Sequence, residues 1–204
     1  MVKNKNTEHY FSSAPKCVDR FGLVRTSLHG KPFEFLTSSS VFSKEKVDPG
    51  TRLLIETMVL PQTGNVLDIG CGYGAVGIAA AALNPNLRLV MTDVNMRAVR
   101  LAKQNLELNK IANAEVRYGY CYEPVEDIEF SCVLSNPPVS AGMETVKNIV
   151  KQAPSVMAPK ASFQMVIRSK IGAKALPALF NQTFGNCTIV GRESGYRVLM
   201  GTCT

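Results

Sequence analysis

The segment that most constrains the fold is DIGCGYGAVG, residues 68–77. It follows an apolar run at 65–70 that is typical of a buried strand, and it leads into a run of small apolar residues at 75–84 that is typical of a helix. Glycines at such a junction can adopt positive φ and let a ligand approach the backbone. The first N–H groups of the following helix are free to bind an anion. The segment therefore predicts a strand–loop–helix unit that binds a ligand at the edge of a sheet.

The rest of the chain continues this alternation of strands and helices with short connections. Further strands are predicted at 87–94, 114–119, 130–136, 162–169, 187–191 and 196–202. Helices are predicted at 51–60, 95–109, 143–157 and 172–184, with a break or kink near Pro154 in the third and near Pro177 in the fourth. Alternating elements of this kind predict an α/β fold with helices on both faces of one sheet.

The first part of the chain follows a different pattern. Residues 23–28 and 32–37 alternate in polarity around a His-Gly-Lys turn, which predicts a β-hairpin. We expect residues 1–48 to form an N-terminal arm and hairpin extension, and residues 49–204 to form the main domain.

Composition excludes several classes of function. The chain has 204 residues, of which 46% are hydrophobic, and no apolar run approaches the length of a membrane span. With no apolar signal-peptide core at the N-terminus, we expect a cytoplasmic protein without membrane contact. The six cysteines form no CxxC pair and there are two histidines, so we expect neither a metal site nor a histidine-centred triad. A net charge of +7 favours polyanionic partners.

The glycine loop leaves two cofactors open. Residues 72–77 match GxGxxG and Asp93 follows about 20 residues later, as in dinucleotide-binding proteins. A nicotinamide-dependent oxidoreductase is therefore one alternative. However, the negative charge of Asp68, before the first glycine, would repel a pyrophosphate and suits the ammonium group of an amino acid. The segment SNPP (135–138), after a later strand, has no role in hydride transfer.

Together these motifs resemble those of class I S-adenosylmethionine-dependent methyltransferases: D-x-G-C-G-x-G, an acid that ends the second strand, and N-P-P after the fourth. Four further stretches are similar to the methyltransferase small-domain group, namely FEFLTSSSVFSKEKVDPGTRLLIE, SNPPVSAGME, QMVIRSKIGAK and GYRVL. That group includes rRNA guanine-N2 methyltransferases, and the chain is particularly similar to the compact single-domain archaeal members of the group. The resemblance covers roughly residues 9–202 and implies that residues 49–204 form the S-adenosylmethionine-dependent methyltransferase domain.

The resemblance implies a Rossmann-like fold with a mostly parallel seven-stranded sheet, and S-adenosylmethionine as the cofactor. It implies that Asp68 faces the methionine amino group and that Asp93 accepts hydrogen bonds from the two ribose hydroxyls. Tyr120 stands where many relatives carry an acid that binds the adenine amino group, so adenine recognition departs from the family pattern. The cofactor-binding residues implied are Asp68, Gly70, Cys71, Gly72, Gly74, Asp93, Val94, Tyr120 and Asn136.

Asn136, Pro137 and Pro138 are the predicted catalytic residues. Two successive prolines fix the backbone after a strand, so the polar groups beside them are held in one orientation. The Asn136 side-chain oxygen and the Pro137 carbonyl can accept both N–H bonds of an exocyclic amine and aim its lone pair at the methyl group. The positive charge that develops on nitrogen strengthens both hydrogen bonds in the transition state.

Contacts to the substrate are predicted more loosely. Many N-P-P methyltransferases carry an aromatic residue next, whereas this chain has Val139, so Phe42 is a candidate for covering the base or the cofactor. Arg168 and Lys170, with Lys174 beyond them, are candidates for contacting phosphates.

We therefore expect an N-methyltransferase, a monomer or homodimer, acting on an exocyclic amine of RNA, most simply guanine N2 of rRNA or tRNA. The alternatives are a protein glutamine or adenine-N6 methyltransferase, and an RNA-binding assembly factor that keeps the cofactor fold without turnover.

Overall fold

The hairpin predicted at the start of the chain is present. The computed structural model describes residues 21–38, 41, 46–137, 142–171 and 174–203. Strands β1 (Phe21–Leu28) and β2 (Lys31–Ser38) pair antiparallel as a separate two-stranded sheet. Both turn residues between them, His29 and Gly30, have positive φ, which suits the twist of a tight hairpin.

The hairpin is attached to helix α3 (Met96–Leu108) by two asparagine side chains. Asn105 exchanges hydrogen bonds with the backbone of Leu36, accepting from its N–H at 2.7 Å and donating to its carbonyl at 2.9 Å. Asn109, just after the helix, does the same with Glu34 at 3.1 and 2.7 Å. These amides satisfy backbone groups that β1 does not reach, and they fix the hairpin to the main domain.

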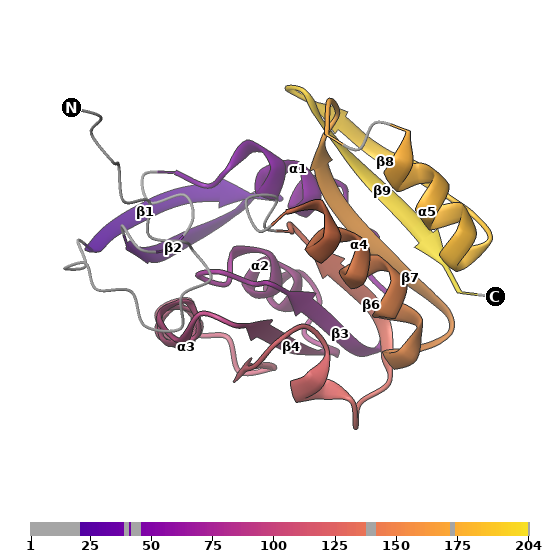
Figure 1. The fold of residues 1–204 in the computed structure, drawn as a ribbon. Coiled ribbons are helices and arrows are strands. Elements are labelled where there is room, and N and C mark those ends of the chain that lie inside the picture. Colours follow the sequence, from indigo (N-terminus) through magenta and orange to yellow (C-terminus); the bar gives the residue numbers. More distant parts are fainter. Residues whose placement is uncertain (1–20, 39–40, 42–45, 138–141, 172–173, 204) are drawn as a thin grey trace, which may run out of the picture.

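The main sheet has seven strands in the order β5-β4-β3-β6-β7-β9-β8. The part from β4 to β8 can be followed by its labels in Figure 1. The neighbouring pairs from β5 to β7 are parallel, and β9 runs antiparallel between β7 and β8. This confirms the predicted seven-stranded, mostly parallel sheet. The strand bounds are β3 (Gly64–Ile69), β4 (Leu87–Asp93), β5 (Ala114–Tyr118), β6 (Phe130–Ser135), β7 (Met157–Arg168), β8 (Thr188–Glu193) and β9 (Tyr196–Thr202).

Helices cover both faces of this sheet, as expected. Along β3, Val66 points into a core shared with α1 (Pro49–Thr57), α2 (Ala75–Leu83) and α3. Its neighbours Leu67 and Ile69 point into a second core on the opposite face. That face is covered by the 3₁₀ turn η1 (Glu123–Val125), α4 (Met143–Gln152), the 3₁₀ turn η3 (Ala153–Val156) and α5 (Ala175–Phe184). Figure 1 shows the hairpin and α5 at opposite ends of the molecule.

Two proline predictions had different outcomes. The break near Pro154 is present, because α4 ends at Gln152 and a 3₁₀ turn continues from Ala153. The prediction of a break near Pro177 is wrong. Helix α5 begins at Ala175, so Pro177 lies in its first turn, where a backbone N–H would have no partner within the helix.

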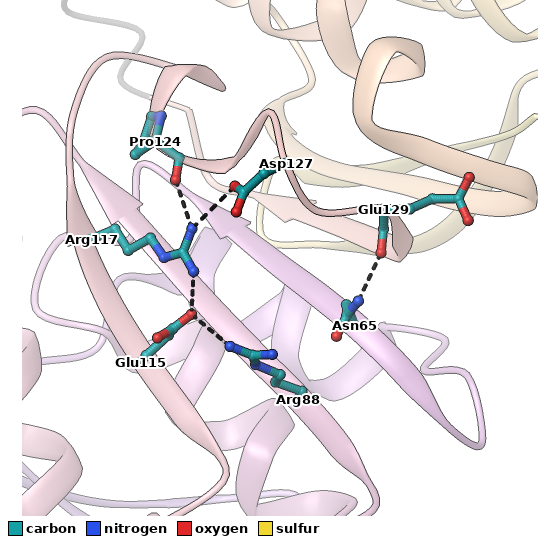
Figure 2. A network of polar contacts seen from close by, with 7 residues as sticks. All are labelled: Asn65, Arg88, Glu115, Arg117, Pro124, Asp127 and Glu129. Carbon is teal, nitrogen blue, oxygen red and sulfur yellow. Dashed lines mark hydrogen bonds and ion pairs between the residues drawn. The ribbon is translucent and has the colours of Figure 1, made fainter.

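A polar network ties the connection between β5 and β6 to the sheet (Figure 2). The Arg117 guanidinium donates to the Pro124 carbonyl at 2.9 Å and to Glu115 at 2.8 Å, and it lies 3.5 Å from Asp127. Arg88 also reaches Glu115, while Asn65 holds the Glu129 carbonyl at the far end of the connection. The network holds this connection in place. The connection includes residues 119–121, which line the cavity described below.

No helix in the described ranges combines the length and the apolar character that a membrane crossing requires.

Candidate active site

A cavity of about 590 Å³ opens at the carboxyl ends of the parallel strands. In open α/β sheets this edge, near the point where strand order reverses, is where ligands bind. The ends of β3, β4, β6 and β7 reach the cavity, together with the glycine loop and residues 119–121. The N-terminal end of α1 and Tyr196, at the start of β9, close it from the other side.

The glycine loop brings backbone rather than side chains to this cavity. Gly70, Gly72 and Gly74 have φ of 72°, 59° and 93°, values that residues with a side chain rarely adopt. The backbone N–H groups of Gly70 and Cys71 both donate to the Thr92 carbonyl at 2.9 Å, which anchors the loop on β4. Helix α2 then begins at Ala75 without a side-chain cap, so its positive dipole end faces the cavity.

Asp68 is a buried carboxylate beneath this loop. Its side chain is 1% exposed, and its Oδ2 accepts the Gly77 backbone N–H at 2.8 Å. Burial raises its pKa from 3.8 to about 7; the charge of Asp93 adds to the rise and the Gly77 N–H opposes it. A cationic ligand group would favour the ionised form, so Asp68 is suited to an ammonium.

Asp93 lies at the end of the neighbouring strand. Its Oδ2 accepts the Gly72 N–H and its Oδ1 accepts the Asn95 N–H, both at 2.8 Å. Burial raises its pKa, while backbone hydrogen bonds from Asn95, Gly72 and Val94 oppose the rise. These bonds fix both oxygens at the cavity wall, where their remaining lone pairs can accept hydroxyl protons.

Cys71 follows Gly70 in the glycine loop, and its thiol is influenced by both acids. Burial raises the pKa of its thiol well above the ordinary value, and the charges of Asp93 and Asp68 add to the effect. The thiol therefore stays protonated near neutral pH, so it is poorly suited to act as a nucleophile.

The Asn136 side chain reaches the cavity from the end of β6. Its Nδ2 donates to Thr51 Oγ1 at 2.8 Å and lies 3.5 Å from Asp48 Oδ2. The Ser135 hydroxyl donates to the Ile69 carbonyl at 3.1 Å and holds this strand end against β3. Pro137 is buried and also lines the cavity.

Asp48 organises the opposite wall. It caps α1 by accepting the N–H groups of Gly50 at 2.9 Å and Thr51 at 3.2 Å through Oδ2. The Tyr196 hydroxyl lies 3.5 Å from its Oδ1 and accepts a hydrogen bond from Arg168 Nε at 3.1 Å. The Arg168 guanidinium also lies over the Tyr196 ring, 5.4 Å from its centroid.

Two hydroxyls in the cavity wall have no hydrogen-bond partner in the described part of the chain. Tyr73 is 4% exposed and Thr92 is 1% exposed, and both line the cavity. Because buried polar atoms are almost always paired, these two point to a polar ligand. No group of three or more potential metal-ligating side chains exists within the ranges that the structure describes.

Comparison with known proteins decides the family. The model of the methyltransferase small domain matches residues 32–200. The chain belongs to the methyltransferase small domain family. It is thus an S-adenosylmethionine-dependent methyltransferase, as the motifs predicted, and the nicotinamide-dependent alternative is wrong.

Among similar proteins, this methyltransferase is 33% identical to the uncharacterized protein YbxB of Bacillus subtilis (strain 168), over 95% of this chain and 97% of that protein. It is 32% identical to the ribosomal RNA small subunit methyltransferase C of Photorhabdus laumondii, over 81% of this chain and 49% of that protein. Its structure matches the T. thermophilus 16S rRNA N2 methyltransferase RsmC, solved with AdoMet and guanosine, with a TM-score of 0.81. That match has 24% identity and covers 94% of this chain and 53% of RsmC. This methyltransferase therefore spans about half the length of the curated rRNA methyltransferases that it matches.

The residues of the cavity fit S-adenosylmethionine. The α2 N-terminus suits its carboxylate, Asp68 its ammonium and Asp93 its ribose hydroxyls, while the Tyr73 and Thr92 hydroxyls offer further polar contacts. These assignments extend the predicted roles and remain predictions.

The structure places most of the predicted site residues of the methyltransferase around one cavity. Ten of them line it: Asp68, Gly70, Cys71, Gly72, Asp93, Val94, Tyr120, Asn136, Pro137 and Arg168. Gly74 lies just outside the lining as the residue before α2, and Lys170 is an exposed residue outside the lining. Phe42, Pro138 and Val139 fall outside the described residues.

Sequence reasoning missed three residues of this site, namely Asp48, Thr51 and Tyr196. Asp48 had a recognisable sequence signal, because an aspartate followed by proline is a typical start of a helix. We instead predicted that this helix begins at residue 51. Tyr196 had no local signal, since its place in the site comes from β9 lying beside β7.

Proposed function

We propose that this methyltransferase modifies an exocyclic amine of RNA, most simply guanine N2 of rRNA or tRNA. The observation that carries the proposal is the position of Asn136 and Pro137, which line the same cavity as the glycine loop and the two buried acids. A nucleophile held by this pair would thus lie beside the cofactor. The named rRNA methyltransferases among the relatives support RNA as the substrate, and so does the net charge of +7.

Different residues of the chain bind the cofactor and position the amine. The α2 N-terminus and Asp68 hold the carboxylate and ammonium of the cofactor, and Asp93 holds its ribose. Bound S-adenosylmethionine supplies an activated methyl group. Asn136 Oδ1 and the Pro137 carbonyl accept the two N–H bonds of the amine and direct its lone pair toward that methyl group.

Transfer then needs no strong base. A carbon–nitrogen bond forms as the carbon–sulfur bond breaks, and the electron pair of the broken bond stays on sulfur. The positive charge moves to the nitrogen, where the two acceptors stabilise it more strongly than in the neutral amine. The methylated ammonium is acidic and releases its extra proton to water. Asp68 and Asp93 need not take that proton, which agrees with the cofactor-binding roles proposed for them.

Adenine N6 and the amide of a protein glutamine fit the same pair of acceptors. RNA guanine is favoured because the named relatives modify rRNA. These alternatives are separated by the identity of the product.

The test uses S-adenosylmethionine with a labelled methyl group. Purified wild-type protein and Asn136→Ala are incubated with total RNA and total protein from a source strain that lacks the gene. RNA is then digested to nucleosides. We expect label in N2-methylguanosine with the wild type, and a decrease of roughly 100-fold or more with Asn136→Ala. Equal cofactor affinity of the two proteins would show that the loss is in transfer rather than in binding.

Other outcomes would contradict the proposal. Label only in protein would assign the activity to a protein acceptor, and label in N6-methyladenosine would change the base. Cofactor binding without transfer to any naked RNA, followed by no transfer to ribosomal particles from the same strain, would favour an assembly factor.

A further inference from the structure

The orientation of the Asn136 amide decides whether this residue can hold an amine at all. A planar amide presents an acceptor, Oδ1, on one side and a donor, Nδ2, on the other. Only Oδ1 can accept an N–H bond of the substrate. If the group rotated by 180° about its last bond, Nδ2 would face the amine and repel it. The proposed reaction therefore needs a device that keeps one orientation.

Thr51 holds the amide but cannot choose its orientation. Its hydroxyl lies 2.8 Å from Asn136 Nδ2, and the residue is 6% exposed. A hydroxyl can donate as well as accept, so it would bind the rotated amide through Oδ1 equally well. A second group must therefore favour one orientation of the Asn136 amide over the other.

Asp48 can favour one orientation of the Asn136 amide. An ionised carboxylate only accepts hydrogen bonds. Its Oδ2 lies 3.5 Å from Asn136 Nδ2, so it attracts the NH₂ side of the amide and would repel the carbonyl side. With Nδ2 directed to Thr51 and Asp48, Oδ1 lies on the other side of the amide and accepts no hydrogen bond from the described part of the chain.

The carboxylate is itself fixed in place. Asp48 Oδ2 accepts the N–H groups of Gly50 and Thr51 at the start of α1. The Tyr196 ring lies so close to Gly50 that a Cβ there would approach it to 2.8 Å. Arg168 donates to the Tyr196 hydroxyl and covers the ring. The carboxylate is thus held by a helix terminus on one side and by an aromatic residue on the other.

We propose that Asp48 and Thr51 are positioning residues that keep the Asn136 amide in the orientation with Oδ1 available to the substrate amine. This rests on the proposed function, because it assigns Asn136 Oδ1 the role of binding the acceptor. It also goes further, since it makes the N-terminus of α1 a part of the transfer machinery.

The decisive variant is Asp48→Asn. Asparagine caps a helix about as well as aspartate, so α1 should keep its start. To keep the cap, its amide oxygen must take the place of Asp48 Oδ2, so the Asn136 amide then faces a neutral acceptor instead of a negative charge. The repulsion of the carbonyl side is weakened, and the rotated orientation becomes more accessible. We expect the kcat of methyl transfer to fall by roughly 10- to 100-fold, with unchanged affinity for S-adenosylmethionine and unchanged KM for RNA.

Two comparisons separate positioning from folding. Thr51→Val should lower kcat by about tenfold, and Thr51→Ser should recover most of that loss because the hydroxyl is retained. Glu107→Gln removes a carboxylate of the exposed face of α3 and serves as the matched control, with expected turnover equal to that of the wild type.

A spectroscopic readout tests the inference without any acceptor. In ¹⁵N-labelled protein, the side-chain amide signal of Asn136 is identified by its loss in Asn136→Ala. We expect one of its protons to be protected from exchange in the wild type and in Glu107→Gln, and to lose protection in Thr51→Val and Asp48→Asn.

The two proposals can fail separately. Turnover of a folded Asp48→Asn variant within twofold of the wild type would overturn the inference and leave the proposed function intact. If the wild type transferred no methyl group to RNA, the proposed function would fail, and the amide signal would still decide the inference. An Asn136 signal that is unchanged in Asp48→Asn would overturn it.

Discussion

Asp68 Oδ2 and the backbone N–H of Gly77 are joined by a hydrogen bond of 2.8 Å that spans the glycine loop from β3 to α2. The bond satisfies one N–H of the first turn of α2 with a carboxylate that the sheet has buried. A Cβ at position 77 would lie 3.2 Å from this same oxygen, and it would approach Met91 more closely still. Cofactor affinity, pH dependence and packing are therefore linked at this point.

The first prediction concerns the pH dependence of cofactor binding. Asp68 must be ionised to bind an ammonium, and its pKa in the free protein is raised to about 7 by burial. As pH falls below 7, a growing fraction of the protein carries a neutral Asp68 that has to lose a proton before binding. We expect the affinity for S-adenosylmethionine to fall between pH 7 and pH 5, approaching tenfold per pH unit. Isothermal titration calorimetry measures this, and an affinity that is constant from pH 5 to 7 would contradict it. In Asp68→Asn, binding should be weak and nearly independent of pH.

The same raised pKa has a consequence for stability. A carboxyl whose pKa is higher in the folded than in the unfolded state favours folding below its unfolded pKa of about 4, and this contribution is lost as pH rises through about 7. The ionised Asp68 therefore destabilises the ligand-free protein at pH 8. Asp68→Asn keeps an oxygen for the Gly77 N–H and removes the buried charge.

We therefore expect Asp68→Asn to melt at a higher temperature than the wild type at pH 8, by at least about 2 °C, and to show a smaller difference at pH 5. Thermal unfolding without cofactor measures the two values. A variant that melts at a lower temperature than the wild type at pH 8 would show that the carboxylate stabilises the free fold.

Gly77 gives a packing prediction. A Cβ at this position would lie 2.3 Å from Sδ and 2.5 Å from Cγ of Met91, which is fully buried on β4. We expect Gly77→Ala to lower the free energy of unfolding by about 1–3 kcal/mol, because the helix has to move away from the sheet. Urea denaturation measures this. In the Met91→Ala background the same change should cost less than about 1 kcal/mol, since the opposing atoms are absent. Equal costs in both backgrounds would assign the effect to another contact.

The glycine loop shows how much of this site could be predicted from the sequence. Asp68, Gly72 and Asp93 lie within 26 residues of one another, and each has a local pattern of strand end or turn. Parallel strands bring their carboxyl ends to one edge, so these patterns were enough to place the cofactor site. The seven strands were likewise predicted from local runs of apolar residues.

The opposite wall could not be predicted in the same way. Asn136 lies 88 residues after Asp48 in the sequence, and Tyr196 lies 148 residues after it. Both side chains nevertheless approach the Asp48 carboxylate. Tyr196 reaches this wall because β9 pairs antiparallel with β7, and Asn136 reaches it because β6 ends beside the start of α1. No local period of the sequence encodes either arrangement. The start of β7 at Met157 was missed for a related reason. Residues 157–161 include Pro159 and a Lys160 with positive φ, and they pair with β6 only around an irregularity in register.

The Tyr73 hydroxyl gives the last prediction, because two buried tyrosines of this chain form a matched pair. Tyr122 is 4% exposed, and its hydroxyl donates to the Ile149 carbonyl at 2.7 Å. Tyr73 is equally buried, but its hydroxyl has no partner in the described part of the chain and the residue lines the cavity. If the cofactor supplies the missing partner, the same chemical change should act on different properties at the two positions.

We expect Tyr122→Phe to lower the free energy of unfolding by about 1 kcal/mol, because a buried carbonyl loses its donor, and to leave the affinity for S-adenosylmethionine unchanged. Tyr73→Phe should leave the ligand-free protein as stable as the wild type or slightly more stable, since it removes a buried hydroxyl that has no partner among the described residues. It should weaken cofactor binding by roughly 5- to 10-fold, equivalent to one hydrogen bond of about 1 kcal/mol. Denaturation and calorimetric titration of both variants give the four values. A Tyr73→Phe variant that binds the cofactor as tightly as the wild type would show that this hydroxyl does not contact it.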